Sequence, residues 1–239
     1  MSETELTDDD VARALSTGTV EVIGRMPWSS NATLLVECVL DEFTVRAVYK
    51  PHAGERPLWD FPDGLWRREI AAYELSVALG WDLVPMTIAR EDAPHGIGSL
   101  QLLIEADYDQ HYFTLLEDER HHRQFRRMAA FDFVANNTDR KSGHCLVDAD
   151  GHVWGIDNGL SFHADFKLRT VIWDFADEPI YDDDLTDLAR LADEPLPAAL
   201  ADLLGPFERD AVVARAQALV RNGVLPADPS GRRWPWPLV

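Results

Sequence analysis

The chain has 239 residues, of which 46% are hydrophobic and 10% aromatic, so it can bury a substantial core and disorder is excluded as its default state. Its formal net charge of −20 repels nucleic acid and anionic lipid headgroups. Composition therefore predicts a globular protein and argues against a nucleic-acid partner or docking on an anionic membrane.

The cysteines and the N-terminal sequence indicate in which cellular compartment the protein is expected. Cys38 and Cys145 are the only cysteines, and each lies in an apolar stretch where a buried free thiol is expected. The first ten residues lack the basic and apolar regions of a signal peptide, and no run of about 18 apolar residues is present. We therefore expect a cytoplasmic protein.

The first half of the chain is predicted to be mainly β. A short helix over Val11–Ser16 precedes three strands and an amphipathic helix, for which Gly80 is a plausible C-cap. Two more strands follow. The predicted strands are Gly18–Ile23, Ala32–Leu40, Phe43–Tyr49, Val84–Ala89 and Ser99–Glu105, and the longer helix is Trp66–Leu79.

The second half is predicted to be mainly helical. Its segments are a helix over His121–Asn136, a hairpin of Cys145–Val147 and Val153–Ile156, and helices over Leu185–Leu191, Ala198–Leu204 and Pro206–Asn222. We expect an α+β fold with a β-rich lobe over residues 1–107 and an α-rich lobe over residues 108–239.

Two acidic residues flank the predicted hairpin. Asp139 lies in the polar loop Asn-Asn-Thr-Asp-Arg, and Asp157 follows an apolar strand and precedes Asn-Gly. Such a turn can direct two carboxylates into one cleft, where they could hold Mg²⁺ and orient a hydroxyl for phosphoryl transfer. Both residues are also common turn formers, so this segment alone leaves either role open.

Upstream residues favour the phosphate-handling role. Lys50 ends an apolar strand, and Glu69 lies on the helix that follows, which is the pairing that kinases use to hold the α- and β-phosphates. The turn from Gly24 to Asn31 offers backbone N–H groups and small hydroxyls, although Ser- and Asn-rich turns are common.

These segments together resemble the phosphatidylinositol 3-/4-kinase superfamily. The residues that carry the resemblance are Val48-Tyr49-Lys50-Pro51, REIAAYELS, LVPMT, GSLQLLIE, NNTDR and GIDNGLSF, in this order between about Glu21 and Trp173. They look closest to type II phosphatidylinositol 4-kinases and their small bacterial relatives. The most specific part is NTDR followed 18 residues later by IDNG.

The resemblance implies a two-lobed kinase-like fold with an ATP cleft between the lobes. In the β-rich lobe it implies that Lys50 contacts the ATP phosphates and that Glu69 orients it. The phosphate loop would contain Ser29, Ser30 and Asn31. The hinge that pairs with adenine would be the end of the strand at Leu103, Ile104 and Glu105.

In the α-rich lobe the resemblance implies that Asp139 accepts the proton of the acceptor hydroxyl and that Asp157 binds Mg²⁺ or Mn²⁺. Arg140 could stabilise either its loop or the transferring phosphate. His144 stands where these kinases have a metal-binding Asn. It could shift the metal preference towards Mn²⁺, leave a single-metal enzyme or weaken activity, or it could simply pack in the loop. Asn137 or Asn158 could supply the missing oxygen ligand.

The sequence thus predicts an ATP-dependent phosphotransferase. Its acceptor is expected to be a protein hydroxyl, including one of its own, or a soluble small molecule rather than a lipid, because the chain is acidic and has no cysteine-rich palmitoylation segment. A nucleotide-binding pseudokinase, a nucleotidyl transferase on the same fold and a phosphatidylinositol 4-kinase remain alternatives. The C-terminal RRWPWPLV could dock on the body or bind a partner.

Overall fold

The structure is a computed structural model that describes residues 6–26 and 32–239. It forms two compact units, and each is described by itself. One comprises Met1–Ile70 with Pro85–Leu103, and the other comprises Ala71–Val84 with Ile104–Val239. The sequence placed the boundary at residue 107 and did not assign 71–84 to the second unit. These residues belong there because Ala71, Leu75, Leu79 and Trp81 are buried in its core.

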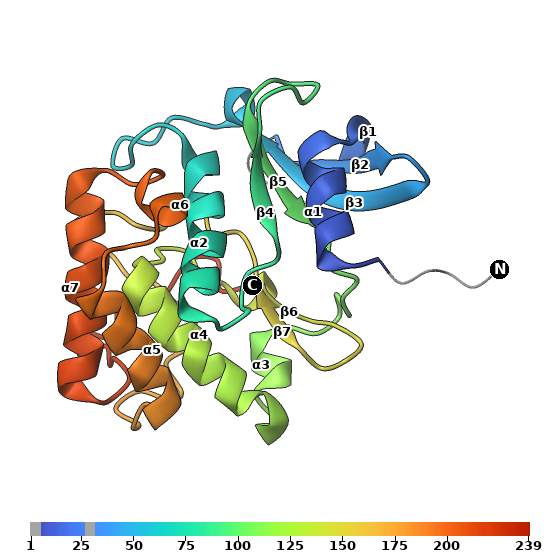
Figure 1. The fold of residues 1–239 in the computed structure, drawn as a ribbon. Helices are drawn as coiled ribbons and strands as arrows, with labels where there is room; N and C mark the ends of the chain where they lie inside the picture. Colours follow the sequence, from blue (N-terminus) through green and yellow to red (C-terminus); the bar gives the residue numbers. More distant parts are fainter. Residues whose placement is uncertain (1–5, 27–31) are drawn as a thin grey trace. The chain divides into compact units, whose positions relative to one another are not determined.

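The first unit is built on a five-stranded antiparallel sheet with the strand order β1-β2-β3-β5-β4 (Figure 1). A hairpin joins β2 to β3 as predicted, while β4 and β5 are both shorter than the sequence indicated. Their bounds are β1 Thr19–Arg25, β2 Leu34–Leu40, β3 Phe43–Pro51, β4 Thr87–Arg90 and β5 Gly98–Leu102.

Helix α1 (Asp8–Thr17) packs against β2, β3 and β4 and closes the small core of this unit. Thr7 begins the helix with a capping box that it shares with Asp10. At the other end, the buried Arg90 guanidinium donates hydrogen bonds to the carbonyls of Leu15 and Gly18, each at 2.7 Å. These contacts satisfy carbonyl groups that the end of a helix leaves unpaired.

Strands β3 and β5 approach each other closely at Gly98. A Cβ atom at this position would lie 2.4 Å from the carbonyl oxygen of Lys50 and 2.7 Å from Cα of Pro51. Only glycine fits such a contact, and Ser99 pairs with Lys50 in the adjacent register. The backbone that carries Lys50 is therefore fixed by its neighbour in the sheet.

Helix α2 (Leu65–Leu79) begins in the first unit and ends in the second. Gly80 follows it with φ of +69°, as expected of a C-cap glycine. The second unit also contains a two-stranded hairpin. The remaining elements are α3 Tyr112–Leu115, α4 His122–Ala135, β6 Cys145–Val147, β7 Val153–Gly155, α5 Asp182–Asp193, α6 Ala198–Ala201 and α7 Pro206–Asn222, with 3₁₀ turns η1 His52–Gly54, η2 Glu119–His121 and η3 Ser142–His144.

The core of the second unit is centred on α4, which contacts α7, while α5 also packs on α7 (Figure 1). Phe125, Met128 and Phe131 on α4 are almost fully buried. Among the described residues, no helix combines the length and apolar character that a membrane span requires.

Candidate active site

In the first unit, the structure brings Lys50 and Glu69 together. Nζ of Lys50 lies 2.5 Å from Oε1 of Glu69, and the two side chains are 21% and 3% exposed. Strand β3 positions the lysine, and the first half of α2 positions the glutamate. The Lys50 side chain is therefore held by Glu69 and remains partly exposed, which suits a lysine that contacts phosphate oxygens.

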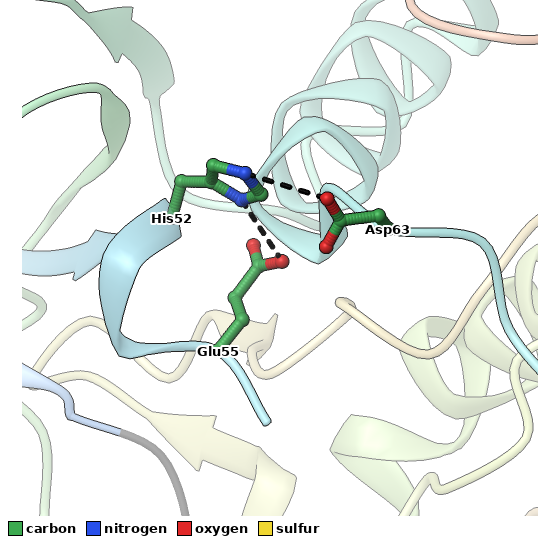
Figure 2. Close-up of side chains that lie close together, drawn as sticks. All are labelled: His52, Glu55 and Asp63. Carbon is green, nitrogen blue, oxygen red and sulfur yellow. Dashed lines mark hydrogen bonds and ion pairs between the residues drawn. The ribbon is translucent and has the colours of Figure 1, made fainter. Parts of the chain in front are cut away.

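A cluster that the sequence analysis did not single out fixes the segment between these two residues. Nδ1 of His52 lies 3.3 Å from Oε2 of Glu55, and Nε2 lies 3.5 Å from Oδ2 of Asp63 (Figure 2). The Glu55 carboxylate also accepts backbone N–H groups from Gly64 and Trp66, at 3.2 and 2.7 Å. Because both of its oxygens are engaged by backbone, Glu55 serves to start helix α2 and hence to place Glu69.

The structure bears differently on the two segments expected to contact the nucleotide, the phosphate loop and the hinge. Ser29, Ser30 and Asn31 lie outside the described residues. The expected hinge strand ends earlier than predicted, at Leu102. Leu103 still donates its N–H to the carbonyl of Arg46, whereas Ile104 and Glu105 are in no strand. Contact of this segment with adenine stays a prediction.

In the second unit, Asp139 is held in a polar loop that follows helix α4. Its backbone N–H donates to Oδ1 of Asn137 at 2.9 Å, and its carboxylate pairs with Nζ of Lys141 at 2.9 Å. Burial raises the pKa of the Asp139 carboxyl, Lys141 acts against this, and the nearby charge of Asp157 raises the pKa further. A carboxylate with a raised pKa is a better proton acceptor near neutral pH.

Asp157 follows β7 with φ of +57°, and its side chain is 51% exposed. Oδ2 of Asp157 lies 3.4 Å from Nε2 of His144, and Nδ1 of His144 accepts the backbone N–H of Lys141 at 3.3 Å. An imidazole that accepts at Nδ1 carries its proton at Nε2 when neutral. This arrangement favours His144 as a donor that orients Asp157 over the predicted role of His144 as a direct metal ligand.

Arg140 is fully buried and cannot reach a bound phosphate, so the structure does not support a role for it at the transferring phosphate. Its guanidinium pairs with Asp132 of α4 at 3.0 Å, and it donates to the carbonyl of Ile156 at 2.8 Å and to Oδ1 of Asn158 at 2.6 Å. Of the two roles that the sequence left open, the structure supports the stabilisation of the loop. Arg140 ties the Asp139 loop to the residues on either side of Asp157.

The amides considered as extra metal ligands are also engaged within the protein. Oδ1 of Asn158 accepts from Arg140, and Oδ1 of Asn137 accepts from Asp139. Both residues are almost fully buried. The partly exposed carboxylate of Asp157 fits a hard divalent cation, which prefers oxygen ligands.

The C-terminal tail docks on this same unit. Ser142, three residues after Asp139, donates its N–H to the carbonyl of Leu238 at 2.8 Å. The carbonyl of Arg233 accepts the backbone N–H of Thr170 and the indole N–H of Trp173, both at 3.2 Å. The tail therefore contacts the segment just after the Asp139 loop and packs on the segment that follows Asp157.

Comparison with known proteins defines the family. A family model described as phosphatidylinositol 3- and 4-kinase matches residues 76–187, a segment that includes Asp139, His144 and Asp157. Protein Rv2133c of Mycobacterium tuberculosis is 42% identical over 270 residues, which cover 96% of this chain and 95% of the relative. The chain belongs to the phosphatidylinositol 3- and 4-kinase family.

Two solved structures have a fold similar to that of this member of the phosphatidylinositol 3- and 4-kinase family. The structure of hydra Fam20 with sugar has a TM-score of 0.61 at 14% identity and covers 92% of this chain and 89% of its own. The Helicobacter pylori proinflammatory kinase CtkA has a TM-score of 0.51 at 10% identity, with coverages of 88% and 94%. These likenesses confirm the kinase-like α+β fold.

Phosphatidylinositol 3- and 4-kinases use ATP with a divalent metal ion, and a pH profile can test the assignment of Asp139. In a plot of the rate of phosphoryl transfer against pH, the rate should fall on the acidic side at a pH above the ordinary pKa of an aspartate. The reason is that burial raises the pKa of Asp139. Removing Lys141 removes a charge that lowers this pKa, so Lys141→Met should move this fall to higher pH. Lys141→Arg, which keeps the charge, serves as the control. A fall that stays in place in Lys141→Met would contradict the assignment.

Proposed function

We propose that this chain is an ATP-dependent phosphotransferase that passes the γ-phosphate of ATP to a hydroxyl. The acceptor is a protein Ser or Thr, including one of its own, or a soluble small molecule. The observation that carries the proposal is the partly buried Lys50–Glu69 ion pair, which is what a kinase-like fold uses to hold nucleotide phosphates. Family membership and the kinase neighbours support the same class of reaction.

Each residue has a distinct part in this reaction. Lys50 binds the α- and β-phosphate oxygens, and Asp157, oriented by His144, holds Mg²⁺ or Mn²⁺. The metal ion, when bound, neutralises charge on the phosphates. Asp139 orients the acceptor hydroxyl and takes its proton as the acceptor oxygen bonds to Pγ and the bond from Pγ to the β,γ-bridging oxygen breaks, releasing ADP.

The net charge of the chain favours one class of phosphoryl acceptor over another. A formal charge of −20 opposes docking on anionic lipid, at roughly 1 kcal/mol for each charge held near such a surface. This favours a protein or a soluble acceptor over a phosphoinositide.

A pseudokinase is the second candidate, and one observation favours it. The Asp157 carboxylate already has a partner in His144, at 3.4 Å, so a metal ion has to share or displace that contact. A protein of this kind would bind nucleotide and regulate a partner without turning over.

Labelled ATP separates the candidates. The purified protein is incubated with γ- or α-labelled ATP and with Mg²⁺ or Mn²⁺, alongside Asp139→Ala and Asp157→Ala. Transfer of γ label that both variants lose supports the proposal, and transfer of α label would indicate nucleotidyl transfer instead. Binding of ATP with no transfer to protein, lipid or common metabolites would support the pseudokinase. Asp165→Ala, which removes an exposed acid of the same unit, should behave as wild type.

A further inference from the structure

Asn136 ends helix α4 and begins the loop that carries Asp139. It adopts the left-handed conformation, with φ of +53° and ψ of +51°, and it is fully buried. Glycine is the usual residue where a helix ends in this conformation, and asparagine is the next choice. A residue that only ends a helix does not need a buried side chain, so the burial of this amide indicates a further role.

The buried amide of Asn136 binds three backbone groups of one segment in the same unit. Nδ2 donates to the carbonyls of His163 and Asp165, at 2.8 and 2.7 Å, and Oδ1 accepts the N–H of Lys167 at 2.8 Å. Both donors of the amide and one of its two acceptor positions are therefore used. The opposite orientation of the amide would direct its oxygen at two carbonyl oxygens, so these partners fix which atom is the nitrogen.

The segment 163–167 leads from the region of Asp157 back to the loop that carries Asp139. Backbone contacts hold the chain on either side of this segment. Phe162 donates its N–H to the carbonyl of Ala135 at 2.6 Å, and Arg169 donates to the carbonyl of Asn137 at 2.9 Å. The Asn136 amide lies between these two anchors in its contacts and fixes the course of the backbone from one to the other.

Arg215 of helix α7 adds a contact at the start of the segment. Its guanidinium is almost fully buried, with Nε donating to the carbonyl of Val134 at 2.7 Å and Nη1 to the carbonyl of His163 at 3.4 Å. The carbonyl of His163 thus accepts from both Arg215 and Asn136. Loss of the Asn136 amide should therefore loosen the segment most at Asp165 and Lys167.

This contact network joins the two carboxylates of the proposed reaction. Transfer requires the acceptor oxygen to be placed accurately relative to Pγ, and a misplacement of about 1 Å can cost about 10²-fold in rate. We propose that Asn136 is a positioning residue for phosphoryl transfer. Its amide holds the segment that follows Asp157 against the loop of Asp139, without itself touching nucleotide or acceptor. This role rests on the proposed function, whereas the contact itself does not.

The first test is the rate of γ-label transfer from ATP to the protein itself. Asn136→Gly removes the amide and suits the left-handed φ, so helix α4 should still end correctly. At saturating ATP the rate should fall about tenfold, while KM for ATP stays within about twofold because Lys50 still holds the phosphates. Asn136→Asp, which keeps the size of the side chain but loses both donors, should show the same split. A residue that only supports the fold would not separate the two constants.

Asp177→Gly is the matched control. Asp177 belongs to the same unit, has φ of +64° and is exposed, so its replacement by glycine should leave the rate and KM within about twofold of wild type. Thermal unfolding of all three variants should stay close to that of the wild type. An equal loss of rate in Asp177→Gly and Asn136→Gly would overturn the proposal.

Hydrogen exchange tests the contact without ATP or metal. The backbone N–H of Lys167 should exchange about tenfold faster in Asn136→Gly than in the wild type, because its acceptor is gone. Unchanged exchange, or faster exchange with an unchanged rate of transfer, would each overturn the positioning role. A wild-type protein that transfers no phosphate, together with faster exchange in the variant, would contradict the proposed function while leaving the contact in place.

Discussion

Replacing Asp139 with Asn is expected to lower the rate of γ-phosphate transfer by about 10²- to 10⁴-fold, the range that general-base groups contribute. The change keeps the size of the side chain and removes the charge that accepts the proton. Affinity for ATP should be unchanged, because the proposal gives Asp139 no contact with the nucleotide. The measurements are the rate of ADP release and the dissociation constant for ATP.

Asp165→Asn is the matched control for this change. Asp165 is an aspartate of the same unit with a side chain that is 86% exposed, so its replacement should leave the rate within about twofold. A rate for Asp139→Asn that equals that of the control would remove Asp139 from the chemistry.

Arg140→Met is expected to destabilise the protein by about 3–5 kcal/mol, because it leaves the fully buried Asp132 carboxylate without its partner. Urea unfolding followed by tryptophan fluorescence measures the loss. Replacing both partners, in Arg140→Met/Asp132→Leu, removes the uncompensated charge and should recover part of the stability. Arg169→Met changes an exposed arginine nearby and should cost less than about 0.5 kcal/mol.

If Arg140→Met destabilises the protein as little as Arg169→Met does, the buried network does not hold the loop that carries Asp139. A variant that unfolds normally but loses γ transfer would instead favour a role of Arg140 at the transferring phosphate.

Elements with strong local signals were predicted closely. Helix α7 runs from Pro206 to Asn222 as expected, since proline favours the first helical position and Gly223 adopts the left-handed conformation that ends a helix. The β2–β3 hairpin and the β6–β7 hairpin also follow the alternation of apolar residues in the sequence.

Features that depend on distant residues were not predictable from the same signals. The four-residue helix α3 is too short to show a helical period. The role of Arg140 was left open because nothing near it in the sequence distinguishes a buried structural arginine from an exposed one that binds phosphate. Its partner Asp132 was read as one more residue of helix α4, and an acid on a mainly apolar helix was the available clue.

The pairing of Lys50 with Glu69 could be predicted from the sequence, whereas the contacts that position other candidate site residues could not. Glu55, which starts helix α2, precedes its contact at Trp66 by 11 residues and offers no motif. His144 was expected to bind metal because of its position in the family pattern, and its contacts on both ring nitrogens became apparent only in the structure.

The metal dependence of ATP binding tests the central claim most directly. Isothermal titration compares ATP affinity with Mn²⁺, with Mg²⁺ and with EDTA, for the wild-type protein and for Asp157→Asn. The account predicts that the metal strengthens binding in the wild type and that Asp157→Asn loses most of this gain while it binds metal-free ATP normally. The same gain in both proteins would contradict the assignment of Asp157, and with it the phosphotransferase site proposed here.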